Sequence, residues 1–268
     1  MIFREYFPHP ELKKYIRCYW TLEISGSTSQ HEWLHFLVEN VEFTFKLSGG
    51  AKFITSDMKT GMFSQCCVYG PMTQTMHLKP LSEVEMFGIC FRPGGAYPFF
   101  PYQISELVNK SVIIDDLWGT KDSEIIHKVH YDCETTVERI DLLDQYFLRH
   151  LGTKRKDNSI FAAVRIIEAY KGQVDIEYVA KSIGLSRRQL ERKFKERVGI
   201  LPKQLCRSFR FKNILKHLNT SSIVSWATTS VSCGYYDQSH MIRDFKHFTG
   251  KSPLAYLATS RVMDRYFT

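Results

Sequence analysis

The chain has 268 residues, of which 44% are hydrophobic, and 36 basic against 28 acidic residues give it a formal net charge of +8. This apolar content is enough to bury the cores of two ordinary domains, which excludes a disordered chain. No run of about eighteen apolar residues occurs, and cations interrupt the first twenty residues, so we expect neither a membrane-spanning segment nor a secretion signal.

Residues 1 to about 115 are predicted to be mostly β-strand. Short runs rich in aromatic and β-branched residues are separated by turn signals such as Gly49-Gly50 and Gly70-Pro71. The predicted strands cover residues 19–24, 36–47, 51–55, 73–78 and 84–92. Strands at such regular spacing favour a small barrel or a sandwich.

Seven cysteines are present, without a CxxC spacing and without an even disulfide framework. This usage predicts reduced thiols in a cytoplasm. Cys66 and Cys67 are adjacent in a predicted strand, where neighbours point to opposite faces, so a disulfide between them would be strained. We therefore expect buried structural thiols rather than a redox switch.

A helical period is present at residues 137–151. Its apolar positions recur three or four residues apart. They are Val137, Ile140, Leu143, Phe147 and Leu151. This stripe either covers the β-rich core or pairs with a second copy of the chain, and the second interpretation predicts a homodimer through the N-terminal domain.

The two halves of the chain differ in charge. Residues 1–152 hold 14 basic and 19 acidic residues, a net of −5, whereas residues 153–268 hold 22 and 9, a net of +13. The sign changes at the polar segment GTKRKDN, which predicts a domain at 1–152, a linker at 153–158 and a second domain at 159–268. Clustered Lys and Arg displace phosphate counterions, so the second domain is predicted to bind a polyanion; a solvated basic face is the alternative.

The basic half contains a repeat with an offset of 51 residues. Upstream of it, Ala180 and Gly184 have a looser echo in Ser230 and Gly234. A small residue, a glycine turn and an Arg-rich amphipathic run predict a helix-turn-helix unit, and the repeat predicts two of them. The matching pairs are Arg192 and Arg243, Phe194 and Phe245, Lys195 and Lys246, Gly199 and Gly250, and Pro202 and Pro253.

The first unit is predicted to present a basic helix on its surface. Gly184 supplies a turn residue with positive φ, and Ser186 with Gln189 forms a predicted capping box at the start of the next helix. Leu190 and Phe194 point inward on that helix, which leaves its basic face outside. A DNA major groove requires such a face.

The second unit is predicted to start its outer helix after Asp237, with Met241 and Phe245 facing inward. Residues 202–219 are predicted to form one helix between the units, about 27 Å long at 1.5 Å per residue. Successive major grooves on one face of DNA lie about 34 Å apart. The linking helix is therefore predicted to place the two outer helices in adjacent grooves.

Residues 159–268 resemble the DNA-binding domain of AraC-type transcriptional regulators in GLSRRQLERKFKERVGILPKQL and CGYYDQSHMIRDFKHFTGKSPLAYL. The resemblance implies an all-helical domain with two helix-turn-helix units. It also implies a sequence-specific regulator of bacterial transcription that lies in the cytoplasm at the nucleoid, binds double-stranded DNA and acts on RNA polymerase. The chain departs from the family at Thr229 and Ser230, where an aliphatic residue and Ala are usual.

By position, the resemblance implies base contacts by three residues in each outer helix. Arg188 and Arg192 are favoured as guanine readers, whereas Arg187 and Lys195 are expected to contact phosphate or solvent. Glu191 either accepts a hydrogen bond from a cytosine amine or pairs with Lys195 four residues on. The predicted DNA-binding residues are Arg187, Arg188, Glu191, Arg192, Lys195, Gln238, Ser239, His240 and Arg243.

The N-terminal half resembles an uncharacterised domain found ahead of AraC-type DNA-binding domains, in HPELKKYIRCYW, VYGPMTQ and FGICFRPGGAYPFF. The resemblance implies a signal-receiving, cupin-like barrel. The predicted fold class is therefore α+β in two domains: a β-rich cupin-like barrel with trailing helices, then an all-α double helix-turn-helix domain. Residues 92–95 are either part of an effector site or only a structural turn. The predicted pocket for a small anionic or aromatic effector consists of Trp20, Trp33, Arg92 and Tyr97.

Residues 31–35 match the H-E-x-x-H zinc motif of metallopeptidases. The flanking sequence favours loop and strand, and His31 and His35 would lie about 13 Å apart in an extended segment, too far to share a zinc ion. A barrel metal site that adds His77 is the alternative, in a metal-binding cupin-type sensor or an enzyme fused to a DNA-binding domain. We predict a regulator without catalytic residues, metal or cofactor.

Overall fold

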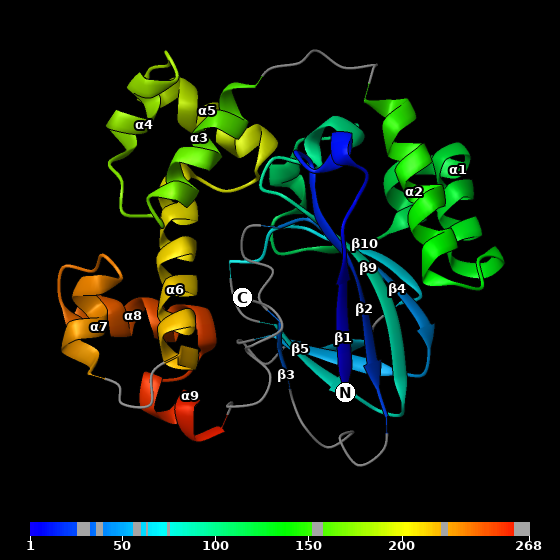
Figure 1. The fold of residues 1–268 in the computed structure, drawn as a ribbon, viewed down its shortest axis with the longest axis horizontal. Helices are drawn as coiled ribbons and strands as arrows, with labels where there is room; N and C mark the ends of the chain where they lie inside the picture. Colours follow the sequence, from blue (N-terminus) through cyan, green and yellow to red (C-terminus); the bar gives the residue numbers. More distant parts are fainter. Residues whose placement is uncertain are drawn as a thin grey trace.

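A computed structural model describes residues 1–25, 33–35, 40–55, 60–62, 64–73, 76–151, 158–220 and 225–259. A β-rich domain with helices on its outer side stands beside an all-helical domain (Figure 1). The predicted two-domain α+β class is confirmed. Every helix in the described ranges is too short or too polar to cross a membrane.

The larger of two antiparallel sheets has the strand order β1-β2-β9-β4-β7-β10. In this sheet Trp20 lies opposite Gly88, and a Cβ atom on residue 88 would come within 2.3 Å of the indole ring. Glycine is therefore required at position 88 for the tryptophan to cover the strand. The strands are β1 (Ile2–Tyr6), β2 (Ile16–Ile24), β4 (Glu42–Ser48), β7 (Cys66–Tyr69), β9 (Val84–Phe91) and β10 (Ser111–Ile113).

The smaller sheet has the strand order β3-β8-β5-β6. Its strands are β3 (Trp33–His35), β5 (Ala51–Thr55), β6 (Thr60–Met62) and β8 (Met76–Pro80). The strands predicted at 19–24, 51–55 and 84–92 are confirmed within a few residues. The run at 36–47 forms strand from Glu42 onward, and its residues 36–39 lie outside the described residues.

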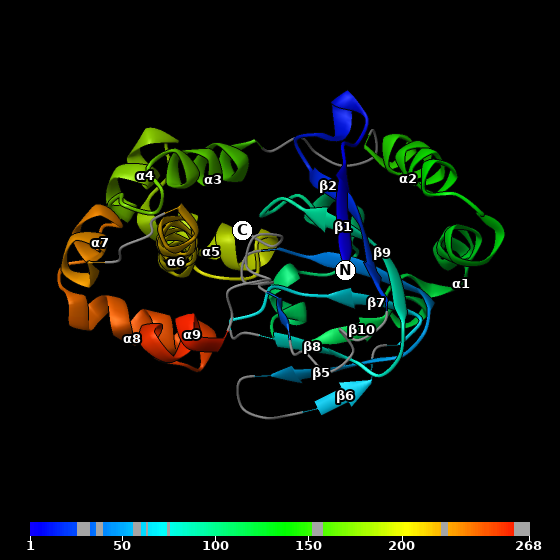
Figure 2. The ribbon, with the colours of Figure 1, turned by 60° about the horizontal axis from the view of Figure 1, so that its bottom comes forward.

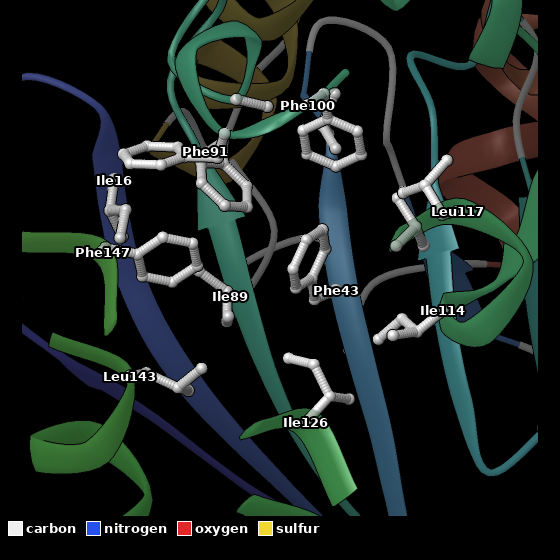
Figure 3. Close-up of a cluster of buried hydrophobic side chains, with 14 of the residues drawn as sticks. Ile16, Phe43, Ile89, Phe91, Phe100, Ile114, Leu117, Ile126, Leu143 and Phe147 are labelled. Carbon is white, nitrogen blue, oxygen red and sulfur yellow. The ribbon is translucent and has the colours of Figure 1, made fainter. Parts of the chain in front are cut away.

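Helices α1 (Ile114–His127) and α2 (Thr136–His150) cover the outer face of the larger sheet (Figure 2). Leu143 and Phe147 of α2 are fully buried, and the Phe147 ring centroid lies 5.6 Å from that of Phe91 and 4.8 Å from that of Phe99. Figure 3 shows the α2 side chains pointing toward the strands. The predicted apolar stripe thus covers the β-rich core.

Val137 was predicted to belong to this stripe, but its side chain is 63% exposed. It lies in the first turn of α2, directly after the capping box that Thr135 and Glu138 form. The capping box fixes the start of the helix, and the buried part of the stripe begins only one turn later, with the half-buried Ile140. Because the stripe packs against the sheet, it no longer supports the homodimer expectation.

A second apolar cluster is built from the other face of β2 and β9 together with β8 of the smaller sheet. It contains Trp20, Met76 and Met86. In β7, Cys67 belongs to this cluster, whereas the neighbouring Cys66 packs against the cluster under α1 and α2. The two thiols therefore point to opposite faces, as predicted, and all seven cysteines are free.

The helical domain contains two apolar cores, and one long helix, α6, contributes side chains to both. The first half of α6 contributes Leu205 to one core, and the second half contributes Phe211 and Ile214 to the other. Figure 1 shows the two groups of helices at opposite ends of α6. The helices are α3 (Ser159–Ala169), α4 (Ile176–Ser182), α5 (Arg187–Arg197), α6 (Pro202–Thr220), α7 (Trp226–Ser232), α8 (Gln238–Thr249) and α9 (Pro253–Thr259).

The domains touch at the end of α5 and at α3. The Tyr97 hydroxyl donates a hydrogen bond of 2.6 Å to Glu196 Oε1 at the end of α5. Gly199 has a φ of 91°, and a Cβ atom there would lie 3.0 Å from Ile104 of the 3-10 helix η4 (Ile104–Leu107). This glycine provides both the left-handed turn after α5 and the close approach of the domains. The predicted linker at 153–158 falls largely outside the described residues, so the domain boundary stays a prediction.

Candidate nucleic-acid interface

The outer helix of the first unit, α5, starts and packs as its sequence predicts. The Ser186 side chain accepts a hydrogen bond from the Gln189 backbone, and the Gln189 side chain accepts one from the Ser186 backbone. The preceding turn places Gly184 at a φ of 69°. Leu190 and Phe194 are fully buried in the first core. The cap and the two buried side chains fix which face of α5 points to solvent.

That solvent face of α5 is basic. Arg188, Arg192 and Lys195 are all exposed and lie four and three residues apart, so they follow one side of the helix. Side chains in this arrangement can reach both base edges and phosphates when a helix lies in a major groove.

Glu191 pairs with Arg187 rather than with Lys195. The Arg187 Nε atom lies 2.9 Å from Glu191 Oε1, and the carboxylate raises the pKa of the guanidinium. Basic residues lie four positions from Glu191 on both sides, Arg187 and Lys195. The carboxylate pairs with Arg187, which is nearer the start of the helix. Such an exposed pair is screened by solvent and therefore weak, so a ligand can replace it at low cost.

The second unit repeats this arrangement in α8. The Asp237 side chain caps the helix by accepting a 2.6 Å hydrogen bond from the His240 backbone, at the position equivalent to Ser186 in the first unit. Met241 and Phe245 are fully buried, as are their equivalents in α5. The equivalents of the exposed cations Arg188, Arg192 and Lys195 are Ser239, Arg243 and Lys246, all of them exposed.

Lys246 was not among the predicted DNA-binding residues. The sequence contains the signal that identifies it, because Lys246 is the repeat partner of Lys195. Gln238 is exposed at the first position of α8. The ring of His240 packs edge-on against Tyr235, with 5.2 Å between the centroids, and is half-buried. His240 is therefore held against its own unit.

Thr229 and Ser230, where the sequence departs from the AraC pattern, are accommodated in α7. Their exposed fractions are 8% and 2%. The Ser230 hydroxyl donates a 2.8 Å hydrogen bond to the Ala227 carbonyl, so its polar group is satisfied inside the helix. Cys233 and Tyr235, which follow them in the sequence, are buried in the second core. The unusual residues are thus compatible with a packed second unit.

An ion pair fixes α8 on α6. Asp244 of α8 has a side chain only 5% exposed, and its Oδ1 atom accepts hydrogen bonds from Arg207 Nη2 at 2.8 Å and from Arg207 Nε at 3.1 Å. The Arg207 guanidinium also lies over the Phe248 ring, 5.7 Å from its centroid. These contacts orient the outer helix relative to the helix that links the units.

The four residues predicted to line an effector pocket have different surroundings. Trp20 is buried between the sheets, and Tyr97 contacts α5. Arg92 lines a cavity between the domains, and its Nε atom donates a 2.8 Å hydrogen bond to the Lys13 carbonyl. Trp33 lies in β3, and its side chain is not among those described. Trp20, Arg92 and Tyr97 thus lie in three different surroundings, and an effector site that involves them stays a prediction.

The zinc motif is only partly described. Residues 33–35 form strand β3, which agrees with the extended conformation expected from the flanking sequence, and His31 lies outside the described residues. His77 lies in β8, opposite Leu34. Within the described ranges no group of three His, Cys, Asp or Glu residues has a geometry that would hold a metal ion.

Residues 4–113 match the family described as a domain of unknown function (DUF6597), and residues 179–259 match the family described as a helix-turn-helix domain. ToxT from Vibrio cholerae is structurally similar, with 12% identity and a TM-score of 0.48 over 97% of this chain and 99% of that chain. An AraC-type regulator from Chromobacterium violaceum is similar with 26% identity and a TM-score of 0.35, over 37% of this chain and 89% of that one. The DNA-binding domain of AdpA, in complex with a target DNA, has 26% identity and a TM-score of 0.34, over 38% of this chain and 92% of that one. No curated protein matches the chain.

The helix-turn-helix match spans both capped units and the helix that joins them, whereas the N-terminal match ends with strand β10. The duplicated units, their basic outer faces and the two family matches agree with one another. The chain is a DNA-binding transcription regulator in which a DUF6597 domain precedes a helix-turn-helix domain.

Proposed function

We propose that α5 and α8 read base sequence in the major groove of double-stranded DNA, and that the chain controls transcription from the sites it selects. The observation that carries this proposal is the equivalence of the two exposed faces. Arg192 and Arg243 occupy the same position in the two units, as do Lys195 and Lys246. Two copies of one basic, capped helix are suited to two contacts with one duplex.

The residues have different roles in this proposal. Arg192 and Arg243 contact guanine, because a guanidinium can donate two hydrogen bonds to O6 and N7. Arg188 and Ser239 occupy equivalent positions but differ in chemistry, so the two units read different sequences. Lys195 and Lys246 contact phosphates and set the position of each helix. The proposed set also includes Arg187, Glu191, Gln238, Ser239 and His240.

Arg188→Ala and Arg243→Ala are each expected to weaken binding to the selected DNA site by about 1–3 kcal/mol and to relax base preference at one position. Fluorescence anisotropy at physiological salt, on the selected duplex and on a scrambled duplex, measures both effects. Arg187→Ala is the matched comparison, because Arg187 lies on the same helix and is expected to contact phosphate or solvent, so its loss should affect both duplexes alike. Equal losses on the two duplexes would reduce Arg188 and Arg243 to phosphate contacts.

The target site is found by selecting genomic fragments with the full chain. A recurrent site with two sequence blocks about one helical turn apart is expected, with one block lost in each arginine variant. Salt-sensitive binding without any sequence preference would contradict base reading by the two helices.

The remaining parts of the proposal concern regulation. We expect the chain to act on RNA polymerase in the cytoplasm, without catalysis of its own, and the N-terminal domain to receive a small-molecule signal. The contact between Tyr97 and Glu196 supports such coupling, because it joins the N-terminal domain directly to helix α5. Sedimentation of the full chain over a range of concentrations tests the predicted homodimer.

A further inference from the structure

A cavity of about 1040 Å³ lies between the helical domain and the β-rich domain. Helices α3 and α6 line it on one side, and the segments around Lys13 and Arg92 line it on the other. In both ribbon views α3 and α6 face the β-rich domain (Figures 1 and 2). The volume is slightly above the range of about 300–1,000 Å³ that is usual for small-molecule sites.

The cavity is strongly basic. Of the 17 described residues that line it, eight are Lys or Arg and one, Glu168, is acidic. The cations come from both domains: Lys14 and Arg17 from the β-rich domain, and Arg165 and Lys216 from the helical domain. Charges of one sign repel each other when they are gathered around a cavity, and a bound anion lowers that repulsion.

Several of these cations are held in place by contacts within the protein. The Arg17 guanidinium lies 3.1 Å from Glu5 Oε1. The Lys14 ammonium donates a hydrogen bond to Asn158 and lies 4.6 Å from the centroid of the Phe161 ring, so it reaches across to α3. Such contacts reduce the entropy that the side chains would lose on binding a ligand.

Lys212 of α6 shows the electrostatic effect of this crowding. Its side chain is half-buried at the cavity wall, and burial, with the positive charges of Arg17 and Lys216, lowers its pKa to about 7. Arg17 belongs to the other domain, so the repulsion acts across the domain contact. An anion in the cavity would relieve this repulsion and restore the charge of Lys212.

The remaining wall is suited to an organic body. Phe161 and Phe209 offer ring faces, and the amides of Asn158 and Asn213 offer both donors and acceptors. None of the side chains proposed to contact DNA lines the cavity. The site is therefore separate from the two outer helix faces.

We propose that the cavity between the domains binds an organic polyanion, a compound with two or more phosphate or carboxylate groups, and that cations from both domains hold it. The ligand would bridge the N-terminal domain to α3 and α6. Its binding does not depend on whether α5 and α8 read DNA.

Isothermal titration of the full chain without DNA tests the proposal, with pyrophosphate, citrate and ATP as probes at matched ionic strength. Saturable binding of one molecule per chain is expected for at least one probe, and the choice between citrate and the two phosphates identifies the anionic group. Lys212→Met and Arg165→Gln should each weaken it about tenfold, the loss of one charge-assisted hydrogen bond. Lys128→Met is the matched control, because Lys128 is exposed and does not line the cavity.

Lys212→Met should keep or raise the melting temperature without ligand, because an apolar side chain replaces a half-buried cation. Lost binding in this variant is then not a failure to fold. Heats that do not saturate, or equal affinities in the wild type and in both cavity variants, would overturn the proposal. Weaker binding of random DNA in these variants, without binding of any probe, would also overturn it and assign the cations to the DNA backbone.

The pH dependence gives a further readout. An anion favours protonated Lys212, so binding takes up a proton, and affinity should fall as the pH rises through about 7. The other charged residues described around the cavity are arginines, lysines and Glu168. Lys212→Arg should retain affinity and lose this part of the pH dependence, whereas the titration of the probe itself affects both proteins alike. Identical pH profiles for the two proteins would remove Lys212 from the site.

The two proposals fail separately. Loss of sequence-selective binding in Arg188→Ala leaves the titration unaffected. A cavity that binds no polyanion leaves the selection of DNA fragments unaffected.

Discussion

Phe245→Ala is expected to unfold the second helix-turn-helix unit while the first stays folded, at a cost of about 3–5 kcal/mol. Phe245 is fully buried, and its ring packs edge-on against Phe211, at 5.3 Å between centroids, and against Tyr256, at 5.2 Å. It thereby holds α8 against both α6 and α9. A core this small has a low free energy of unfolding. The free energy lost with one central ring is comparable with that whole value.

Phe194→Ala is the matched variant, because Phe194 is the repeat partner of Phe245 and is fully buried in the other core. Hydrogen exchange followed by mass spectrometry should show lost protection in α7 to α9 for Phe245→Ala and in α4 and α5 for Phe194→Ala. Equal loss of protection over the whole helical domain in both variants would show that the two cores unfold as one unit.

Arg207→Met is expected to destabilise the second unit by about 3–5 kcal/mol, because it leaves the carboxylate of Asp244 buried without its cation. Asp244→Asn should cost less. The Arg207 side chain is 29% exposed and can be hydrated, whereas the Asp244 side chain is 5% exposed. Urea unfolding of both single variants and of the double variant measures the coupling.

The double variant should be more stable than Arg207→Met alone, since it removes the buried charge together with its partner. Additive losses in the two single variants would show that the pair does not interact energetically. A loss below about 1 kcal/mol in Arg207→Met would place this ion pair with weak surface pairs.

The helical domain was largely predictable because its signals are local. The capping box of Ser186 and Gln189, the positive φ of Gly184 and the inward positions of Leu190 and Phe194 depend on residues within one or two turns of each other. Because the sequence of α8 repeats that of α5, the same cap position and the same inward positions could be predicted for α8. Even within this range the pairing of Glu191 with Lys195 was not the one formed, because Arg187 is an equally spaced basic residue on the other side.

The β-rich domain was less predictable because its contacts connect distant segments. The sequence did not indicate strands β1 and β10, which lie at the two edges of the larger sheet. For the same reason the sequence did not indicate that Trp20, Arg92 and Tyr97 have three different surroundings. The basic cavity combines β2, α3 and α6, and a spacing pattern along the chain cannot show that these segments meet.

The gathering of cations at the domain contact gives ionic strength two opposite effects on this molecule. Salt weakens DNA binding, because counterions released from the phosphates gain less entropy in a more concentrated salt solution. The same salt shortens the Debye length to about 8–10 Å at physiological concentrations and screens the repulsion between Arg17 and the cations of α6. A rise in salt therefore weakens DNA binding, while it lowers the electrostatic repulsion between the two domains.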